Sequence, residues 1–275
     1  MEKIIQNTTY AQKAAIFRKL DRQSILVLAD FDRTLTMAIN RSGQKNSSVA
    51  LVRESKLMEE EYRCRAQELM GSYQPFEKLV LQTRAEISDY LNRSWQEQLQ
   101  LMIEYELSRE ILANIVNEAD VLFRPGMAEF IDYLSLNNIP LVVMSAALGD
   151  VIELMFKKAK LWRPNIHVIA NFFSFDNDGL ITGFSGPIIN MVNKYETMLA
   201  DYPVYDLIKE RRNVLLIGDS VDDVGMVEGF SYDNLLKIGY LNEPDEIQIE
   251  QYKNVFDLVV LNDGDLTEII RILIN

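Results

Sequence analysis

Two carboxylates follow an apolar run near the N-terminus, where they can do chemistry. Residues 30–36 read Asp-Phe-Asp-Arg-Thr-Leu-Thr and come directly after Ile25–Ala29. A carboxylate at such a strand end can coordinate a divalent cation with one oxygen and attack phosphorus with the other. Asp30 suits this role, and Asp32 can handle the proton. The alternative is a pair of acidic turn formers that close a strand.

A second acidic cluster follows another apolar run. Residues 218–223 read Gly-Asp-Ser-Val-Asp-Asp and come after Val214–Ile217. Glycine permits a close approach, and Asp219 and Asp223 can both reach a cation near Asp30 if the chain turns into a helix. The alternative is a plain helix N-terminus, where aspartates meet the helix dipole favourably.

Two further residues suit a phosphate group. Ser145 follows Leu-Val-Val-Met, and the pattern predicts that a helix begins soon after it. A small hydroxyl with free amides at a helix start can bind a phosphate oxygen, although serine is also an ordinary helix cap. Lys194 is an ordinary surface lysine when considered alone. In a phosphate site it would neutralise the phosphoryl group.

Composition excludes several other classes of protein. The only histidine, His167, lies inside a strand-like run, and the only cysteine, Cys64, excludes an intramolecular disulfide and a cysteine zinc site. A formal net charge of −13 argues against nucleic acid and anionic membranes as partners. The first twenty residues contain no apolar stretch of the kind found in signal peptides or membrane spans, so we expect a soluble, cytoplasmic protein.

The elements that must position these residues form a recognisable pattern. Four apolar runs end in polar or small residues, and they lie at 25–29, 141–144, 167–170 and 214–217. Helical patterns lie between most of them, as in Met127–Leu136 and Leu148–Ala159. The pattern predicts an α/β fold with a Rossmann-like parallel sheet covered on both faces. Ligands bind such sheets at the carboxyl ends of the strands, where Asp30, Ser145 and Asp219 converge.

A long helical segment interrupts this pattern. Residues 39–48 are typical of a linker, and Val52–Met70, Arg84–Ile103 and Ser108–Glu118 show helical spacing. We therefore expect an inserted helical cap at 41–118 and a core made of 1–40 and 119–275. Phe-Asp-Asn-Asp-Gly-Leu within Phe172–Gly186 indicates a β-hairpin.

Together, these motifs resemble the haloacid dehalogenase superfamily of phosphotransferases. The two aspartate motifs, Ser145 and Lys194 stand in that family's order. More narrowly, the chain resembles the cytosolic type III, or pyrimidine, 5′-nucleotidases. That likeness is carried by residues 144–153, 170–176, 193–194 and 236–242, and it is much weaker in the cap.

The resemblance implies a Mg²⁺-dependent phosphatase. Asp30 would form an aspartyl phosphate, and Asp32 would protonate the leaving group and later deprotonate water. The implied metal site comprises Asp30, the Asp32 carbonyl, Asp219 and, as a direct or supporting residue, Asp223. Ser145, Lys194 and the amides of Phe31, Asp32 and Ala146 would hold the phosphoryl oxygens.

The cap departs from the family pattern. Where the family has a glutamate followed by aromatic residues that read a pyrimidine base, this chain has Arg93, Ser94 and Trp95, with Glu97 about one turn away. A guanidinium donates hydrogen bonds where a carboxylate accepts them, so the base preference can differ.

The leading hypothesis is a phosphatase for nucleoside 5′-monophosphates, with pyrimidine nucleotides as the family's substrates. A phosphatase for another small phosphomonoester, such as phosphoserine or a sugar phosphate, is the alternative on the same core. A catalytically silent binding protein is the third reading. Each enzyme hypothesis implies a small-molecule phosphomonoester as the partner, and no sequence feature indicates an oligomeric state.

Overall fold

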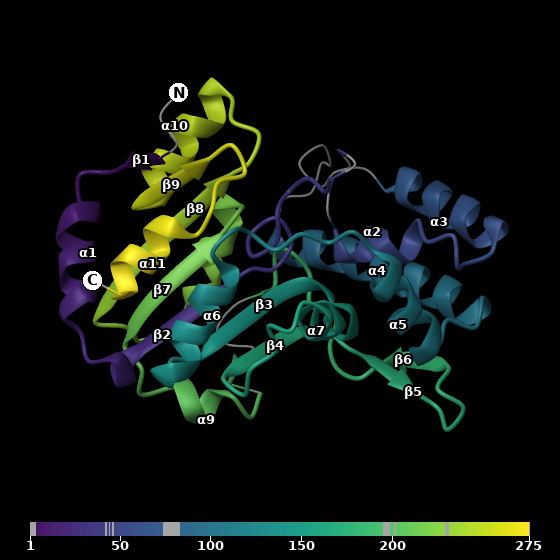
Figure 1. Ribbon diagram of the computed structural model, residues 1–275. Coiled ribbons are helices and arrows are strands. Elements are labelled where there is room, and N and C mark those ends of the chain that lie inside the picture. The colour runs from purple at the N-terminus through teal and green to yellow at the C-terminus, as the bar shows by residue number, and fades with distance from the viewer. Residues whose placement is uncertain are drawn as a thin grey trace.

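A parallel sheet runs through the centre of the molecule. The computed structural model describes residues 4–41, 43, 45, 47–73, 83–194, 199–200, 202–228 and 231–274. Within them the main sheet has seven strands in the order β1-β9-β8-β7-β2-β3-β4 (Figure 1). All pair in parallel except β1, which is antiparallel to β9. The strands are β1 (Ile4–Gln6), β2 (Ile25–Ala29), β3 (Leu141–Leu148), β4 (Ile166–Asn171), β7 (Asn213–Gly218), β8 (Asn234–Leu241) and β9 (Leu258–Leu261). The predicted α/β architecture is confirmed.

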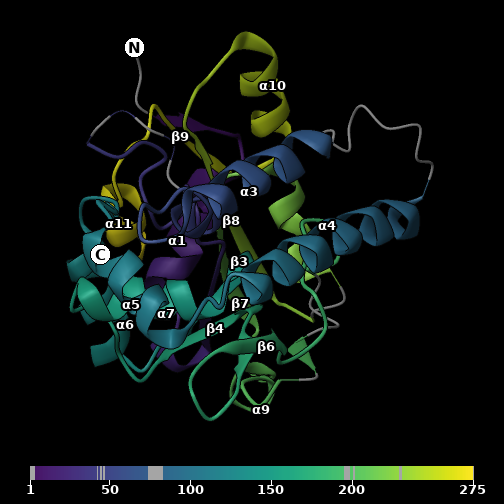
Figure 2. The same cartoon turned by 90° about the vertical axis from the view of Figure 1, so that its right-hand side faces the viewer.

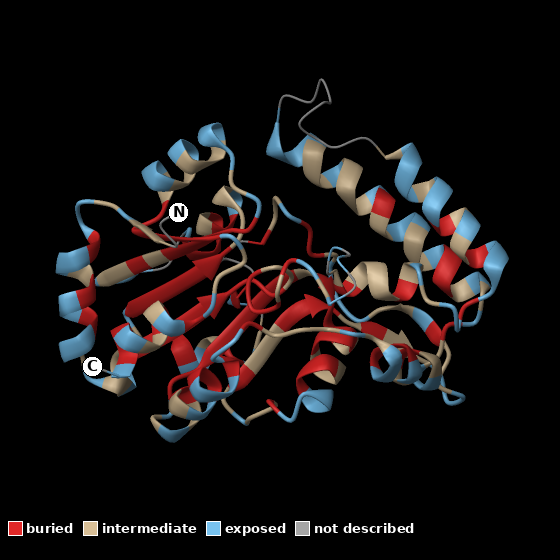
Figure 3. Ribbon diagram, turned by 45° about the horizontal axis from the view of Figure 1, so that its top comes forward, coloured by how far each residue is buried: buried red, intermediate tan, exposed pale blue. Residues whose placement is uncertain are grey.

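Helices cover both faces of the sheet, which explains why its strands are nearly continuous apolar runs. In β2, Val27 packs into one apolar cluster and Leu28 into another on the opposite face, because successive side chains alternate. The first face is covered by α1 (Tyr10–Lys19), α6 (Met127–Leu136), α7 (Gly149–Lys158) and α11 (Thr267–Ile274). The second is covered by α9 (Tyr205–Ile208), the 3-10 helix η3 (Val221–Val227) and α10 (Glu246–Val255). Figure 3 shows the buried strands between these layers. A short 3-10 helix, η1 (Arg22–Ser24), leads into β2.

Four of the described helices, which lie between β2 and α6 in the chain, form a separate layer that we call the helical insertion (Figure 2). They are α2 (Ser48–Arg53), α3 (Glu60–Ser72), α4 (Arg84–Glu104) and α5 (Arg109–Glu118). The expected single helix over Val52–Met70 is wrong, because the chain leaves α2 at Glu54 and re-enters a helix at Glu60. The Ser55 hydroxyl accepts a hydrogen bond from the Leu57 amide at 3.2 Å, and such a local turn competes with a continuous helix.

The predicted hairpin is present and packs on the insertion. Strands β5 (Phe173–Phe175) and β6 (Ile181–Phe184) pair in antiparallel fashion. The Arg109 amide donates to the Gly179 carbonyl at 3.0 Å, and the rings of Trp95 and Phe184 meet edge to face with centroids 6.0 Å apart. The hairpin therefore extends the insertion although it follows β4 in the chain, and Figure 1 shows it below α4 and α5.

The insertion joins the sheet through two paired segments. Thr36 forms an antiparallel bridge with Phe123, and the Met37 amide donates to the Leu122 carbonyl at 2.8 Å. The expected linker at 39–48 lies just beyond this pairing, and its residues 42, 44 and 46 are outside the described part. Entry and exit of the insertion are thus side by side.

Candidate active site

The three polar strand ends lie at one level of the sheet because β2 is flanked by β3 and β7. Ala29 is in register with Val143 of β3 and with Ile217 of β7. The Asp30 amide donates to the Ile217 carbonyl at 3.0 Å, which ties the first aspartate to the neighbouring strand. The expected convergence at the carboxyl edge is therefore observed.

Three of the predicted aspartates form one cluster. Ligand oxygens of Asp30, Asp219 and Asp223 all lie within 4.8 Å of one another. Asp223 Oδ2 accepts hydrogen bonds from the Asp219 amide at 3.0 Å and the Ser220 amide at 2.9 Å. Gly218 makes this possible, since a Cβ atom there would lie 2.5 Å from the Asp223 side chain.

Lys194 lies between two of these carboxylates. Its Nζ is 2.7 Å from Asp30 Oδ1 and 2.7 Å from Asp223 Oδ1, and only 7% of its side chain is exposed. Burial alone would lower the pKa of Lys194, but the charges of Asp223 and Asp30 outweigh it and raise that pKa. The lysine is therefore held as a cation at the floor of the site.

The cluster carries more negative charge than Lys194 neutralises. Burial raises the pKa of Asp30 well above its ordinary value, and the charges of Asp223 and Asp219 add to the effect. Burial, followed by the charge of Asp223, raises the pKa of Asp219 to about 7. Carboxylate oxygens gathered at this spacing match the donors that Mg²⁺ prefers, so the residues fit a divalent cation.

Asp32 is bound to the helical insertion. Its carboxylate accepts hydrogen bonds from the amide of Ser48, the first residue of α2, at 3.0 and 3.1 Å and from the Ser48 hydroxyl at 2.8 Å. Burial raises the pKa of Asp32 to about 6, although the bonds from Ser48 oppose the shift. A carboxyl group with this pKa can both donate and accept a proton near neutrality.

A pocket of about 590 Å³ opens above the aspartates and is closed on its far side by the insertion. Ser145 and Ala146 lie in its wall together with Lys194. The helix expected soon after Ser145 is confirmed, since β3 continues to Leu148 and α7 begins at Gly149. An irregular register between Met144 and Leu148 bends the strand, and this bend brings the serine to the pocket.

The insertion contributes Trp95 to the pocket but neither Arg93 nor Glu97. Both of those side chains are exposed and absent from the pocket lining. On α4 the pocket is lined by Tyr90, Leu91, Ser94, Trp95 and Gln98, which follow the spacing of one helical face. Arg93 projects from the side of the helix away from Trp95, whereas Glu97 forms a side-chain hydrogen bond with Tyr73, a residue of the pocket wall. A role of Arg93 and Glu97 in base preference stays a prediction.

The lining residues that the sequence analysis missed include Arg33, Arg53 and Asn190. Asn190 joins the core to α4, since its Nδ2 donates to Ser88 Oγ at 2.9 Å and to Asn92 Oδ1 at 3.0 Å. A lone arginine or asparagine carries no periodic signal. Arg33 was detectable only through its place next to Asp32.

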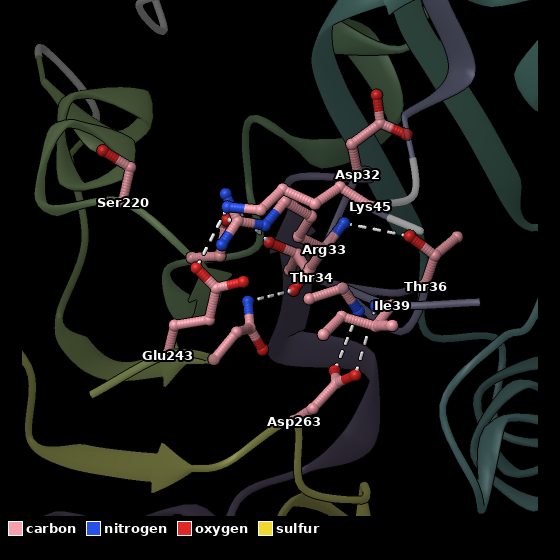
Figure 4. Close-up of polar contacts among 12 residues, drawn as sticks. Asp32, Arg33, Thr34, Thr36, Ile39, Lys45, Ser220, Glu243 and Asp263 are labelled. Carbon is pink, nitrogen blue, oxygen red and sulfur yellow. Dashed lines mark hydrogen bonds and ion pairs between the residues drawn. The ribbon is translucent and has the colours of Figure 1, made fainter. Parts of the chain in front are cut away.

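A buried arginine supports the turn after Asp32. The Arg124 guanidinium donates to the carbonyls of Thr34, Arg33 and Gly264 and to the side chains of Asp263 and Asn242. It also stacks on the Tyr240 ring at 3.7 Å from the centroid. Arg33 has a positive φ of 62°, and its amide is held by the Thr36 hydroxyl at 2.9 Å. Figure 4 shows this turn between Asp32 on one side and Asp263 on the other.

Sheet order and site together define a phosphatase of the haloacid dehalogenase type. A phosphoserine phosphatase in its apo form has the same fold, with a TM-score of 0.53 at 17% identity over 90% of this chain and 97% of the other. Cytosolic 5′-nucleotidase IIIB bound to cytidine is more similar, with a TM-score of 0.86 at 25% identity over 99% of this chain and 92% of the other.

Sequence comparison identifies the family. Residues 33–275 match the pyrimidine 5′-nucleotidase (UMPH-1) family, and the match begins just after Asp32. A 7-methylguanosine phosphate-specific 5′-nucleotidase from Mus musculus is 32% identical over 241 residues, which are 87% of this chain and 80% of the relative. A putative cytosolic 5′-nucleotidase 3 from Caenorhabditis elegans is 30% identical over 88% of this chain and 66% of the relative. The chain belongs to the pyrimidine 5′-nucleotidase family and is a phosphoric monoester hydrolase. In the described part, no helix combines the length and apolar character that crossing a membrane requires.

Proposed function

We propose that the protein hydrolyses nucleoside 5′-monophosphates with Mg²⁺, through an aspartyl phosphate on Asp30. The observation that carries this proposal is the contact of Lys194 with both Asp30 and Asp223 at the floor of the pocket. Aromatic side chains of the insertion, including Trp95 and Tyr90, lie in the pocket wall and suit the flat base of a nucleotide.

The metal would be held by Asp30, Asp219 and the Asp32 carbonyl. Both carboxylate oxygens of Asp223 already have partners, namely two amides and Lys194, which favours a supporting role for this residue. The oxygens of Asp219 are less engaged, with Thr34 Oγ1 at 3.3 Å and Arg33 Nε at 3.7 Å. A bound Mg²⁺ supplies positive charge for the phosphoryl group and the carboxylates around it.

The chemistry takes two displacement steps. A carboxylate oxygen of Asp30 bonds to phosphorus while the bond to the nucleoside 5′-oxygen breaks, and Asp32 gives its proton to that oxygen. Asp32 then takes a proton from water, whose oxygen bonds to phosphorus as the bond to Asp30 breaks. Ser145, the Ala146 amide and Lys194 bind the phosphoryl oxygens and stabilise the charge that develops on them.

We also propose the domain division predicted from the sequence, in which 41–118 is a cap over a core made of 1–40 and 119–275. The position of the pocket between the two supports it. A cytoplasmic location is supported by the name of the Caenorhabditis elegans relative. The formal net charge of −13 argues against nucleic acid as a partner.

The decisive experiment measures phosphate release with and without Mg²⁺ from UMP, CMP, GMP, 7-methyl-GMP, phosphoserine and glucose 6-phosphate. Asp30→Asn removes the nucleophile, so we expect turnover to fall to background while the fold is kept. Asp178→Asn makes the same change in the turn between β5 and β6, away from the pocket, and should retain full activity.

Turnover by Asp30→Asn at a substantial fraction of the wild-type rate would contradict the nucleophile assignment. Activity on phosphoserine or glucose 6-phosphate alone would keep the core chemistry and contradict the nucleotide assignment. An absence of phosphate release from every ester would favour a silent binding protein.

A further inference from the structure

The two walls of the pocket differ in charge. The acidic residues that line it in the described part of the chain come from the core, namely Asp30, Asp32, Asp219, Asp222 and Asp223. Among the described residues of the insertion that line it, Arg53 is the only charged one, and the others are apolar, aromatic or neutral polar. The part of a substrate that points away from the phosphate therefore meets a positive charge.

The Arg53 guanidinium is partly buried and incompletely paired. Only 18% of its side chain is exposed, and its Nη2 contacts the exposed carboxylate of Glu54 at 2.7 Å. Its Nε is buried and has no hydrogen-bond partner among the residues that the structure describes. A buried donor without an acceptor costs free energy, so a ligand that brings an acceptor to this guanidinium gains from the contact.

We propose that Arg53 is a specificity-determining residue, which selects a neutral base with carbonyl acceptors and disfavours a cationic base. Uracil, cytosine and guanine have such carbonyl groups, whereas 7-methylguanine carries a positive charge from its methylated N7. This inference rests on the proposed function. It separates the chain from relatives that are named for 7-methylguanosine phosphate.

The aromatic residues of the pocket oppose the preference for a neutral base, because aromatic rings attract cations. The sizes of the attraction and of the repulsion from Arg53 decide which effect is larger. Stacking of a cationic base on Trp95 gains about 3- to 30-fold in affinity from the cation–π interaction. Repulsion from the Arg53 guanidinium has the opposite effect. If the two positive charges lie about 6 Å apart at an effective dielectric constant of about 20, the affinity for the cationic base falls about a hundredfold. The ion pair with the exposed Glu54 carboxylate offsets only part of this repulsion, because exposed ion pairs contribute little free energy.

The test compares kcat/KM for 7-methyl-GMP with kcat/KM for GMP, because the two nucleotides differ only in the methyl group and its charge. The assay is run at slightly acidic pH, where the methylated base keeps its N1 proton and therefore its positive charge. We expect wild-type protein to prefer GMP.

The variants test the charge of Arg53. Arg53→Glu should raise the ratio of kcat/KM for 7-methyl-GMP to kcat/KM for GMP by about tenfold or more, and Arg53→Gln should give an intermediate ratio. Lys56→Glu reverses an exposed charge three residues away that does not line the pocket, and it should leave the ratio unchanged.

A wild-type preference for 7-methyl-GMP over GMP would overturn the inference, as would Arg53→Glu and Arg53→Gln ratios within twofold of the wild-type ratio. Arg53→Gln also serves if the charge reversal prevents folding. Failure of the proposed function looks different, because wild-type protein would then release phosphate from none of the nucleotides.

Discussion

At the scale of single residues, burial controls the protonation of the site. The pKa of Asp32 is raised to about 6 and that of Asp219 to about 7, so the folded chain binds these protons more tightly than the unfolded chain. Their contribution to stability is complete below the ordinary value of 3.8 and is lost as the pH rises through about 6 and about 7.

Bound Mg²⁺ should oppose this loss, because it favours the charged carboxylates. We expect the increase in melting temperature on adding Mg²⁺ to be small near pH 5 and larger near pH 7 to 8, by about several degrees. Thermal unfolding at both pH values, with and without the ion, measures the difference. Asp219→Asn should remove most of the increase in melting temperature that Mg²⁺ causes. An equal increase at both pH values in the wild-type protein would contradict the link between Mg²⁺ and these carboxylates.

The aspartate cluster was predictable at this scale because its residues come from two short sequence motifs. Asp30 and Asp32 lie in one short segment, as do Asp219 and Asp223, and apolar runs mark the strands before them. Arg53 was not predictable, since its role depends on which side of the pocket its helix occupies. Nothing in the local sequence specifies that position.

At the scale of elements, α2 connects Asp32, the proposed proton-transfer residue, to the insertion. The Ser48 hydroxyl donates to Asp32 and favours its charged form, so Ser48→Ala should raise the pKa of Asp32 further and move the pH optimum of kcat/KM upward. A pH profile of the variant measures this shift.

Ser47→Ala is the matched comparison. The Ser47 hydroxyl caps α2 by accepting from the Ala50 amide at 3.4 Å, and its loss should cost about 1 kcal/mol of stability without moving the optimum. Equal pH profiles for the two variants would show that the Ser48 hydroxyl does not tune Asp32.

The limits of sequence analysis are also visible in the elements. The bounds of α6 agree with the predicted Met127–Leu136, since its apolar spacing is strong. The orientation of α4 was not predictable from alignment with the family, because Arg93 and Trp95 project from different sides of the helix. Edge strand β1 has only three residues, too few for a periodic pattern.

At the scale of the whole molecule, Arg124 holds together segments that are far apart in the chain. It bonds to the turn after β2 and to the loops after β8 and β9. Lysine lacks the planar, forked set of N–H donors of a guanidinium, so Arg124→Lys leaves several buried carbonyls without donors. The substitution should lower the free energy of unfolding by about 3 kcal/mol or more. It should also reduce kcat, since the turn that carries Asp32 loses support.

Urea denaturation measures the loss. Arg212→Lys makes the same substitution in an exposed ion pair with Asp233. We expect it to change the free energy of unfolding by no more than about 0.5 kcal/mol. Similar losses in both variants would contradict a special role for the buried arginine. Sequence analysis could not detect Arg124, because its partners are about 90 to 140 positions away.

The paired crossing at Thr36 and Phe123 has a consequence for evolution. The insertion leaves and rejoins the sheet at one place, so its helices can change without altering strand order or the positions of the aspartates. In the function proposed above, bond cleavage depends on the core, while recognition of the leaving group depends on the insertion. A lineage can therefore acquire a new substrate through substitutions in the insertion that keep Ser48, the residue that binds Asp32, without interrupting the ancestral chemistry.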